Sequence, residues 1–315
     1  PSDVLTVASL EKSGSLEEGQ IRVSVKFSPI NPADINYIQG VYGIRPELPA
    51  TPGLEACGVV LESNSDQVRE GDHVIFIERV GSWKNEVACD VKSVYVFPKG
   101  LAVCHEQASM LKVNPLTALR LLEDFVDLKA GDYVIQNAAN SGVGQCLIQI
   151  AKQLGIKTIN VVRREEVMTE LADLGADHVL LDDTDLVAKV REICGETSPK
   201  LACNAVGGDS ALRLMDAIAE KGAHVTYGAM SLRSLKVPNK FLIFKRIHIQ
   251  GLWVTEWIKD SSEQEVNAAY TKLAEWISEG KLTQPIDTIY PVEEVNKAAD
   301  HAMQGKRSGK ILLKF

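Results

Sequence analysis

One short stretch, Tyr133–Val162, has a residue pattern suited to binding a charged ligand. An apolar segment, Tyr133–Gln136, has the length of a buried strand and runs into the small-residue turn Asn137–Gly144. Apolar residues at helical spacing then continue to Leu154, and a second apolar segment, 158–162, comes shortly afterwards. Strand, turn, helix and strand in this order form a βαβ unit, in which the free N–H groups of the helix N-terminus face the turn. Phosphate is the ligand that such a helix end suits best.

The turn departs from the usual G-x-G-x-x-G pattern of dinucleotide-binding proteins, because only Gly142 and Gly144 remain. A glycine-containing turn of this kind can serve packing alone. The end of the second strand favours a ligand, because Arg163 and Arg164 stand where an NAD-binding protein carries an acidic residue for the ribose. Two guanidinium groups can bind the 2′-phosphate of NADP(H) through paired hydrogen bonds, so NADPH is favoured over NADH. The alternative is a pair of arginines that are simply solvated after a strand.

Length and composition bound the class of protein. With 315 residues the chain is long for one domain, and two domains are expected. The net charge of −8 argues against a nucleic-acid surface, and no apolar run approaches the length of a membrane span. Six cysteines without a C-x-x-C pair suggest neither a disulfide framework nor a thiolate zinc site, and reduced thiols fit an intracellular compartment. Because the chain opens on Pro1, we also expect that a transit peptide has been removed.

The two expected domains differ in their rhythm of elements. The first hundred residues are typical of a β-rich domain, with strands at 21–27, 55–61 and 73–77. From about Val113 helices and strands alternate, which predicts an α/β domain with a mostly parallel sheet covered on both faces. The strands expected after the βαβ unit are 178–181, 201–206, 224–227, 247–254 and 311–315, and the main helices are 211–220, 263–280 and 293–303.

Several motifs together resemble one branch of a known superfamily. They are Asn31–Asn36, Gln39–Gly43, Pro46–Ala50, Gln136–Gln145, Thr158–Arg163 and Thr226–Met230. In these motifs the chain is similar to the zinc-free medium-chain dehydrogenases/reductases and, within them, to the mitochondrial trans-2-enoyl-thioester reductases. The resemblance implies a discontinuous, β-rich GroES-like catalytic domain, residues 1–112 and 258–315. It also implies an inserted Rossmann domain with a doubly wound parallel sheet that binds NADPH, residues 113–257, and a cleft that separates the two domains.

The resemblance also bears on metal. Zinc-dependent members carry glycine, histidine and glutamate where this chain has Gly53, Leu54 and Glu55, and a leucine cannot bind zinc. No metal site is therefore expected. The neighbours Cys104 and His105 could be interpreted as a ligand pair or a thiolate dyad, but adjacent side chains generally point apart. Without an electrophilic metal, alcohol dehydrogenation loses its means of stabilising an alkoxide, whereas reduction of an activated C=C bond needs only a hydride, a donor for the enolate oxygen and an acid.

Tyr42 is the candidate for that acid. It stands in the turn Gly40–Gly43, where the resembling family carries its tyrosine proton donor. A free phenol, with a pKa of about 10, stays protonated at neutral pH and can donate to a forming carbanion. The alternative is a tyrosine that packs its ring and leaves its hydroxyl in water.

The resemblance implies cofactor contacts at many further positions. They are Asn114 beside the nicotinamide; Asn140, Ser141, Gly142 and Val143 at the pyrophosphate; Arg163 and Arg164 at the 2′-phosphate; Tyr227, Gly228, Ala229, Met230, Leu252, Trp253 and Val254 around the ribose and nicotinamide; and Lys310 near the C-terminus. Asn114 has an equally good structural role as a helix cap before Pro115. Core or surface roles stay open for Trp253 and Lys310.

The interpretation that joins these residues is an NADPH-dependent reduction of trans-2-enoyl thioesters of CoA or acyl carrier protein in mitochondrial fatty-acid synthesis. Hydride passes to the β-carbon, and a proton passes from Tyr42 to the α-carbon. Two alternatives stay open: a zinc-free NADPH quinone oxidoreductase, and a crystallin-like protein that binds NADPH without turnover. Family habit implies a homodimer through the sheet edge near Ile247–Leu252, a mitochondrial location, and no nucleic-acid or membrane partner.

Overall fold

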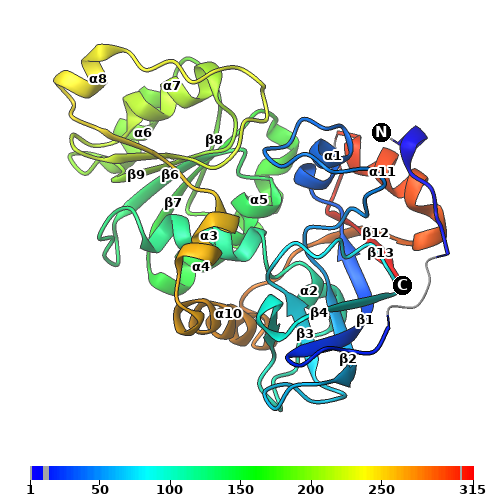
Figure 1. Ribbon diagram of the computed structural model, residues 1–315. Coiled ribbons are helices and arrows are strands. Elements are labelled where there is room, and N and C mark those ends of the chain that lie inside the picture. The colour runs from blue at the N-terminus through cyan, green and yellow to red at the C-terminus, as the bar shows by residue number, and fades with distance from the viewer. Residues whose placement is uncertain (1, 10–13, 306) are drawn as a thin grey trace. The chain divides into compact units, whose positions relative to one another are not determined.

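The computed structural model describes residues 2–9, 14–305 and 307–315. The chain divides into two compact units: residues 1–113 with 261–315, here called the first unit, and residues 114–260, here called the second unit (Figure 1). Each unit has its own sheet and its own apolar core.

A seven-stranded sheet forms the frame of the first unit. Its strands follow the order β12-β13-β1-β2-β3-β5, and β4 also pairs with β1. The long strand β1 lies antiparallel to β2, β4 and β13, and its alternate residues Ile21, Val23 and Val25 are buried in the core that the sheet encloses. The bounds are β1 Gln20–Pro29, β2 Cys57–Ser63, β3 His73–Phe76, β4 Glu86–Asp90, β5 Val94–Val96, β12 Ile286–Pro291 and β13 Lys310–Lys314.

Helices of the first unit pack on parts of this sheet, with α2 against β1 and β2 and α11 against β13. The helices described in this unit are η1 Ser2–Val4, α1 Pro32–Ile38, η2 Val91–Ser93, α2 His105–Ser109, α10 Glu263–Ser278, η4 Val292–Glu294 and α11 Val295–Met303. The helix α1 begins as expected, with Pro32 in its first turn and the Asn31 N–H donating to Asp34 Oδ2 at 2.9 Å. A second core joins α1 and α11 to β13 through Ile35, Ala298 and Ile311.

The second unit is built on a six-stranded sheet whose paired neighbours are all parallel. The order is β11-β10-β9-β6-β7-β8, so the chain reverses its direction of winding between β6 and β9. The carboxyl ends of all six strands therefore lie at one edge, where ligands bind in folds of this kind. The bounds are β6 Tyr133–Asn137, β7 Lys157–Val162, β8 His178–Leu181, β9 Leu201–Asn204, β10 Ala223–Thr226 and β11 His248–Gly251.

Helices cover both faces of the parallel sheet (Figure 1). On one face Leu186 of α6 and Leu214 of α7 pack against Ile135, and on the other Ile148 of α4 and Leu171 of α5 share a core. The expected α/β class, with a parallel sheet covered on both sides, is confirmed. The helices are α3 Asn114–Glu123, α4 Gly142–Leu154, η3 Glu165–Val167, α5 Met168–Leu174, α6 Leu186–Cys194, α7 Gly208–Ala217, α8 Asn239–Ile243 and α9 Val254–Asp260. Among all the helices described, none is both long enough and apolar enough to cross a membrane.

Two strands were predicted to be longer than the structure shows. The segment 201–206 ends as a strand at Asn204, because Oδ1 of Asn204 accepts hydrogen bonds from the Val206 and Gly207 N–H groups at 3.2 and 3.0 Å and turns the chain. The segment 247–254 ends as a strand at Gly251. The Trp253 carbonyl accepts from the Glu256 N–H at 3.0 Å, which starts the helix α9 that the apolar pattern concealed.

His224 is an unusual core residue of the second unit. It lies on β10 between Ala202 of β9 and Ile249 of β11, with no exposed surface. Neither ring nitrogen has a hydrogen-bond partner among the described residues. Burial lowers the pKa of His224 to about 4, well below the value of about 6.5 of a free imidazole.

We expect His224 to make stability depend on pH. Its folded-state pKa lies below its unfolded-state pKa, so the unfolded chain takes up the proton first and stability falls as the pH drops below about 6.5. The free energy of unfolding should lose about 2 kcal/mol from this residue between pH 7 and pH 5, measured by urea titration. His224→Leu should remove this contribution and reduce the dependence of stability on pH, whereas His248→Gln, at an exposed residue of the neighbouring strand, should not reduce it. An identical slope in His224→Leu would contradict the assignment.

Candidate functional site

The turn between β6 and α4 forms the candidate phosphate site of the second unit. Ser141 caps α4, because its Oγ accepts from the Gly144 N–H at 3.2 Å. Ala138 has a φ of +49°, a left-handed conformation that glycine usually supplies. The chain therefore makes the turn of a dinucleotide-binding protein with an alanine at a glycine position. The first N–H groups of the helix α4 are left to bind an anion.

Two glycines of this turn are fixed by close approach. A Cβ on Gly144 would lie 2.4 Å from the Ala139 carbonyl oxygen, so only glycine allows α4 to pass so near the end of β6. A Cβ on Gly142 would lie 2.4 Å from Nδ2 of Asn114, the first residue of α3. Asn114 is buried, so the structure brings two of the predicted cofactor residues, Asn114 and Gly142, into contact.

A network of buried amides and hydroxyls holds the neighbouring strand ends together. Asn137 Nδ2 donates to Asn204 Oδ1 at 2.8 Å and to Ser210 Oγ at 3.0 Å, while Asn137 Oδ1 accepts from the Ala205 N–H at 2.8 Å. Asn204 Nδ2 in turn donates to Thr226 Oγ1 at 3.1 Å. The carboxyl ends of β6, β9 and β10 are thereby joined by side chains that are hydrogen-bonded and largely buried.

The other predicted cofactor residues of the second unit follow the carboxyl ends of its strands. Exposed Arg163 and partly buried Arg164 come directly after β7. The segment Tyr227–Met230 follows β10, and its Met230 N–H donates to the Ala205 carbonyl at 2.9 Å. The segment Leu252–Val254 follows β11. Since the strands are parallel, the structure gathers these residues with Asn140–Val143 along one edge of the sheet.

Tyr227 links the end of β10 to the phosphate turn. Its hydroxyl is buried and has no hydrogen-bond partner of regular geometry among the described residues. Burial raises the pKa of the Tyr227 phenol, and the nearby Ser141 hydroxyl opposes the rise. A buried hydroxyl beside the N-terminus of α4, with no hydrogen bond of regular geometry, is a group that a ligand could engage.

The predicted acid, Tyr42, belongs to the first unit and lies in the turn after α1. The guanidinium carbon of Arg79 is 5.3 Å from the centre of its ring and 4.5 Å from the centre of the Tyr37 ring. Both terminal nitrogens of Arg79 are buried and lack hydrogen-bond partners in the described part of the chain. A desolvated positive charge therefore lies against the phenol ring of Tyr42.

Lys310 belongs to the first unit, where it opens β13. There its Nζ contacts Asn31 Oδ1, and Asn31 Nδ2 donates to Glu55 Oε1 at 2.8 Å. Burial raises the pKa of Glu55, and the charge of Lys310 is the main influence that opposes the rise. Lys310 thus compensates a buried carboxylate in this unit.

The comparisons with known proteins fit this geometry. The alcohol dehydrogenase GroES-like domain matches residues 17–109, and the zinc-binding dehydrogenase model matches residues 142–275. The mitochondrial enoyl-[acyl-carrier-protein] reductase of Xenopus tropicalis is 39% identical over 307 residues, which cover 94% of this chain and 87% of the relative. This chain belongs to the mitochondrial enoyl-[acyl-carrier-protein] reductases. The resemblance drawn from its motifs is confirmed.

Solved structures of related enoyl thioester reductases have the same fold. The mitochondrial 2-enoyl thioester reductase Etr1p/Etr2p heterodimer from Candida tropicalis aligns with a TM-score of 0.90 and 28% identity, covering 100% of this chain and 96% of that one. The complex of Etr1p with NADP and crotonyl-CoA aligns with a TM-score of 0.85 and 28% identity, covering 95% and 92%.

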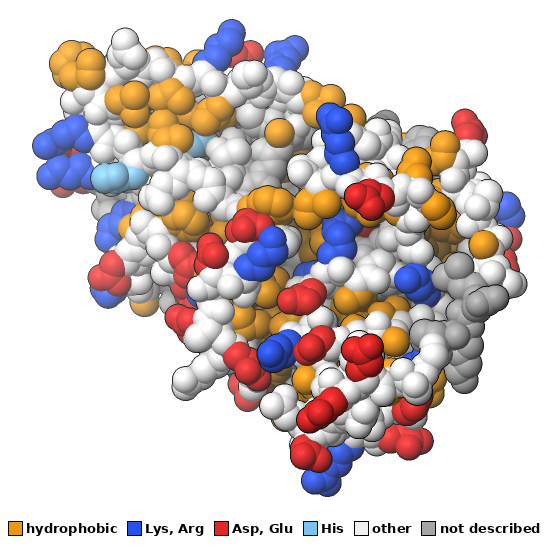
Figure 2. Space-filling model, in the orientation of Figure 1, with side chains coloured by type: hydrophobic (Ala, Val, Ile, Leu, Met, Phe, Trp, Pro, Cys, Tyr) orange, Lys and Arg blue, Asp and Glu red, His pale blue; other side chains and the backbone are white. Residues whose placement is uncertain are grey.

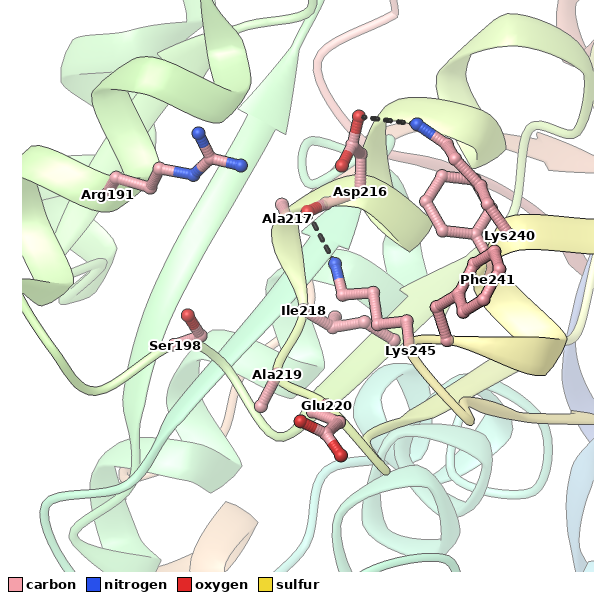
Figure 3. Close-up of a pocket in the computed structure, with 11 residues that line it drawn as sticks. Arg191, Ser198, Asp216, Ala217, Ile218, Ala219, Glu220, Lys240, Phe241 and Lys245 are labelled. Carbon is pink, nitrogen blue, oxygen red and sulfur yellow. Dashed lines mark hydrogen bonds and ion pairs between the residues drawn. The ribbon is translucent and has the colours of Figure 1, made fainter. Parts of the chain in front are cut away.

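A separate pocket of this enoyl reductase lies at the amino ends of the parallel strands. It has a volume of about 530 Å³ and is lined by the segments that lead into β9 and β10, with Ser198, Ala219 and Glu220 among them (Figure 3). Lys245 Nζ donates there to the Met215 and Asp216 carbonyls at 2.9 and 2.6 Å, which caps the C-terminus of α7. The position of Lys245 in this pocket is explained by its capping of α7. Dinucleotides bind at the carboxyl ends of parallel strands, and this pocket lies at their amino ends.

Sequence reasoning missed two features that lie beside the predicted site residues. The Asn137, Asn204 and Ser210 network leaves no periodic signal, although asparagine at the end of two buried strands is a hint. Arg79 had no signal at all, because its contact with Tyr42 joins residues far apart in the chain.

Proposed function

We propose that this chain reduces trans-2-enoyl thioesters of CoA or acyl carrier protein with NADPH, in mitochondrial fatty-acid synthesis. The observation that carries the proposal is its near full-length similarity to Etr1p, which was captured with NADP and crotonyl-CoA. The substrate of that complex has an activated C=C bond, and the relatives named as enoyl-[acyl-carrier-protein] reductases are mitochondrial.

The second unit would hold the NADPH. The N-terminus of α4, with Asn140, Ser141, Gly142 and Val143, suits the pyrophosphate. The guanidinium groups of Arg163 and Arg164 suit the 2′-phosphate, since they follow β7 at the position where the ribose lies in such folds. Asn114 supports the first turn of α4. The residues after β10 and β11, Tyr227–Met230 and Leu252–Val254, lie at the same edge and suit the ribose and nicotinamide.

Tyr42 is the proton donor in this proposal. When bound, NADPH supplies the hydride for the β-carbon, and the Tyr42 hydroxyl gives its proton to the α-carbon of the resulting enolate. The buried charge of Arg79 beside the ring favours the phenolate that Tyr42 becomes after it has given up its proton. Arg79 therefore acts through Tyr42, as a positioning residue.

Zinc is not assigned a role in the reduction. Leu54 is buried and has no metal-binding atom in its side chain, and its carbonyl accepts a hydrogen bond from Lys112 Nζ at 2.8 Å. Burial lowers the pKa of Lys112 to about 8. The nearby Glu55 carboxylate accepts from the Val113 N–H at 2.9 Å and from Asn31. The Leu54 carbonyl and the Glu55 carboxylate are therefore engaged in hydrogen bonds with Lys112, Asn31 and the Val113 N–H.

Tyr42→Phe tests the role of the phenol. NADPH binding, measured by fluorescence titration, should be unchanged, whereas crotonyl-CoA reduction should fall by about 10²–10⁴-fold because the general acid is lost. Tyr37→Phe is the matched control, since the Arg79 guanidinium also lies over that ring, and it should keep its turnover. Full activity in Tyr42→Phe would remove Tyr42 from the mechanism. Turnover of quinones above that of crotonyl-CoA by the unmodified chain would instead support a quinone oxidoreductase.

Arg163→Ala and Arg164→Ala test the choice of cofactor. Each change should raise the KM for NADPH by about tenfold or more, because a charge-assisted bond to the 2′-phosphate is lost, while the KM for NADH stays the same. Arg246→Ala is the control, because Arg246 is also an exposed arginine of the second unit but pairs with Glu220, and these two residues precede the strands β11 and β10 instead of following a strand. Equal effects on both cofactors would show that the two arginines do not recognise the 2′-phosphate.

A homodimer through β11 is part of the proposal. This strand is the edge of the sheet, and His248, Gln250 and Gly251 are exposed on it. Apolar side chains gather over the neighbouring α8 (Figure 2), where Ile243 is 63% exposed and Phe244 is 77% exposed. An open strand edge beside an apolar patch suits pairing with a second copy.

Phe244→Glu tests this pairing. Sedimentation should show a dimer for the unmodified chain and weaker association for Phe244→Glu, because a charge would then have to be buried at the contact. Met303→Glu, at an exposed apolar residue of the first unit, should remain dimeric. A monomeric unmodified chain would overturn the proposed assembly.

A further inference from the structure

Three metal-ligating side chains converge in the first unit, outside the residues of the proposed reaction. The sulfur of Cys57 and one ring nitrogen each of His73 and His105 all lie within 4.8 Å of one another. Nδ1 of His105 and Nε2 of His73 are 2.9 Å apart, and Cys57 Sγ donates to the His105 carbonyl at 2.9 Å. Histidine nitrogen and cysteine sulfur are the donors that Zn²⁺ and similar ions prefer.

The secondary structure fixes the three donors. Cys57 opens β2, His73 opens β3 and His105 is the first residue of α2. The strands β2 and β3 are paired, with Cys57 opposite Ile75. The ring of His73 stacks on Phe97, with centroids 4.6 Å apart and an angle of 23° between the planes. The three donors thus lie on helices and strands, and the ring of His73 is fixed by its packing against Phe97.

We propose that Cys57, His73 and His105 bind a borderline divalent transition metal, with Zn²⁺ the ion that suits them best and water in the fourth position. Zinc bonds of about 2.0–2.1 Å to nitrogen and about 2.3 Å to sulfur, in a tetrahedron, place ligand atoms roughly 3.3–3.6 Å apart. The donors lie at comparable separations, with 2.9 Å between the two histidine nitrogens and no more than 4.8 Å for any pair. Binding would require only that the three side chains adjust to the tetrahedral spacing.

An ion can reach the site, and its charge is accommodated there. Cys57 has no exposed surface, but His73 and His105 are each only partly buried, so the proposed ion would enter from the side of the two imidazoles. Burial raises the pKa of the Cys57 thiol, and the carboxylate of Glu106 adds to the rise. The thiol therefore keeps its proton until an ion displaces it, and the same carboxylate attracts a cation.

The exchange is balanced in protons. The metal–sulfur bond forms as the S–H bond of Cys57 breaks, and that proton is released to solvent. One ring nitrogen of the His73–His105 hydrogen bond carries a proton, which passes through solvent to the outer nitrogen of the same ring, so both inner nitrogens can donate lone pairs. One ion enters and one proton leaves. No step of the proposed reduction uses this site.

Cobalt titration of the full-length, metal-stripped chain tests the proposal. Co²⁺ should bind with one ion per chain and give the near-ultraviolet absorption of a thiolate–cobalt bond, which Zn²⁺ then abolishes by displacement. Cys57→Ser should lose this absorption, and His105→Gln should weaken binding by on the order of 100-fold or more, since even loss of an outer partner of a ligand costs 10–100-fold. The exposed Cys104→Ser is the matched control and should behave as the unmodified chain.

The outcomes separate clearly. No stoichiometric binding by the unmodified chain, with its fold confirmed by circular dichroism, would overturn the site and leave the pair of histidines as an ordinary hydrogen bond. The thiolate absorption persisting in Cys57→Ser and vanishing in Cys104→Ser would also overturn it. If Cys57→Ser fails to fold, the absorption and affinity of His105→Gln decide in the same way.

Discussion

The second unit depends on one hydrogen-bonded side chain, that of Asn137. It lies at the end of β6, where the sheet reverses its direction of winding, and its amide contacts the ends of β9 and α7 through Asn204, Ala205 and Ser210. Leaving such a buried amide without its hydrogen bonds costs about 1–3 kcal/mol. The bonds of Asn137 therefore fix the ends of β6 and β9 relative to each other. The turns that follow them start from fixed positions, and a cofactor site made from several loops needs that.

The phosphate turn extends this constraint by one more step. Gln136 Nε2 donates to the Gly144 carbonyl at 2.9 Å and to Asn160 Oδ1 at 2.7 Å, so a single amide fixes the first turn of α4 and the middle of β7. The absence of a Cβ at Gly144 lets the helix come close enough for this bond. Arg163 and Arg164 follow the strand that Asn160 belongs to. One buried network therefore fixes both of the segments that are proposed to hold the pyrophosphate and the 2′-phosphate.

The sequence predicted the features that depend on local chemistry. The strand 178–181 is β8 without change, and α10 begins at Glu263 as expected, because its cap Ser262 and Glu265 are encoded within four residues. Ala138 shows where this reasoning weakens: it takes the left-handed conformation without the glycine that signals it, since the surrounding network overrides the local preference. Alternation marked the sheet, but it could not place α9, because Leu252–Val254 is apolar in either structure.

The parts of the site that could not be predicted are contacts between residues far apart in the chain. The residues after the parallel strands were foreseeable as a group, because the carboxyl ends of parallel strands share an edge. The contact of Arg79 with Tyr42, the pairing of Lys310 with Asn31 and the convergence of Cys57, His73 and His105 join separate elements, and no spacing rule connects them. Cys104 and His105, adjacent in the chain, do point to different surroundings: His105 turns to His73, while Cys104 is exposed.

The first unit places more charge in its interior than its fold requires. Asp34 and Glu55 have no exposed surface, and burial raises the pKa of each carboxyl, while Lys310 and, for Asp34, Arg79 oppose the rise. Apolar residues of similar size would pack there at lower cost in desolvation. The proposed role of Tyr42, which needs a positive charge held beside its phenol, would account for the arrangement. Asp34 balances the charge of Arg79 at long range without forming an ion pair with it, so the guanidinium stays available to the ring of Tyr42. In the proposed reaction that charge would favour the phenolate left when Tyr42 gives up its proton, and a direct ion pair between Asp34 and Arg79 would weaken this effect.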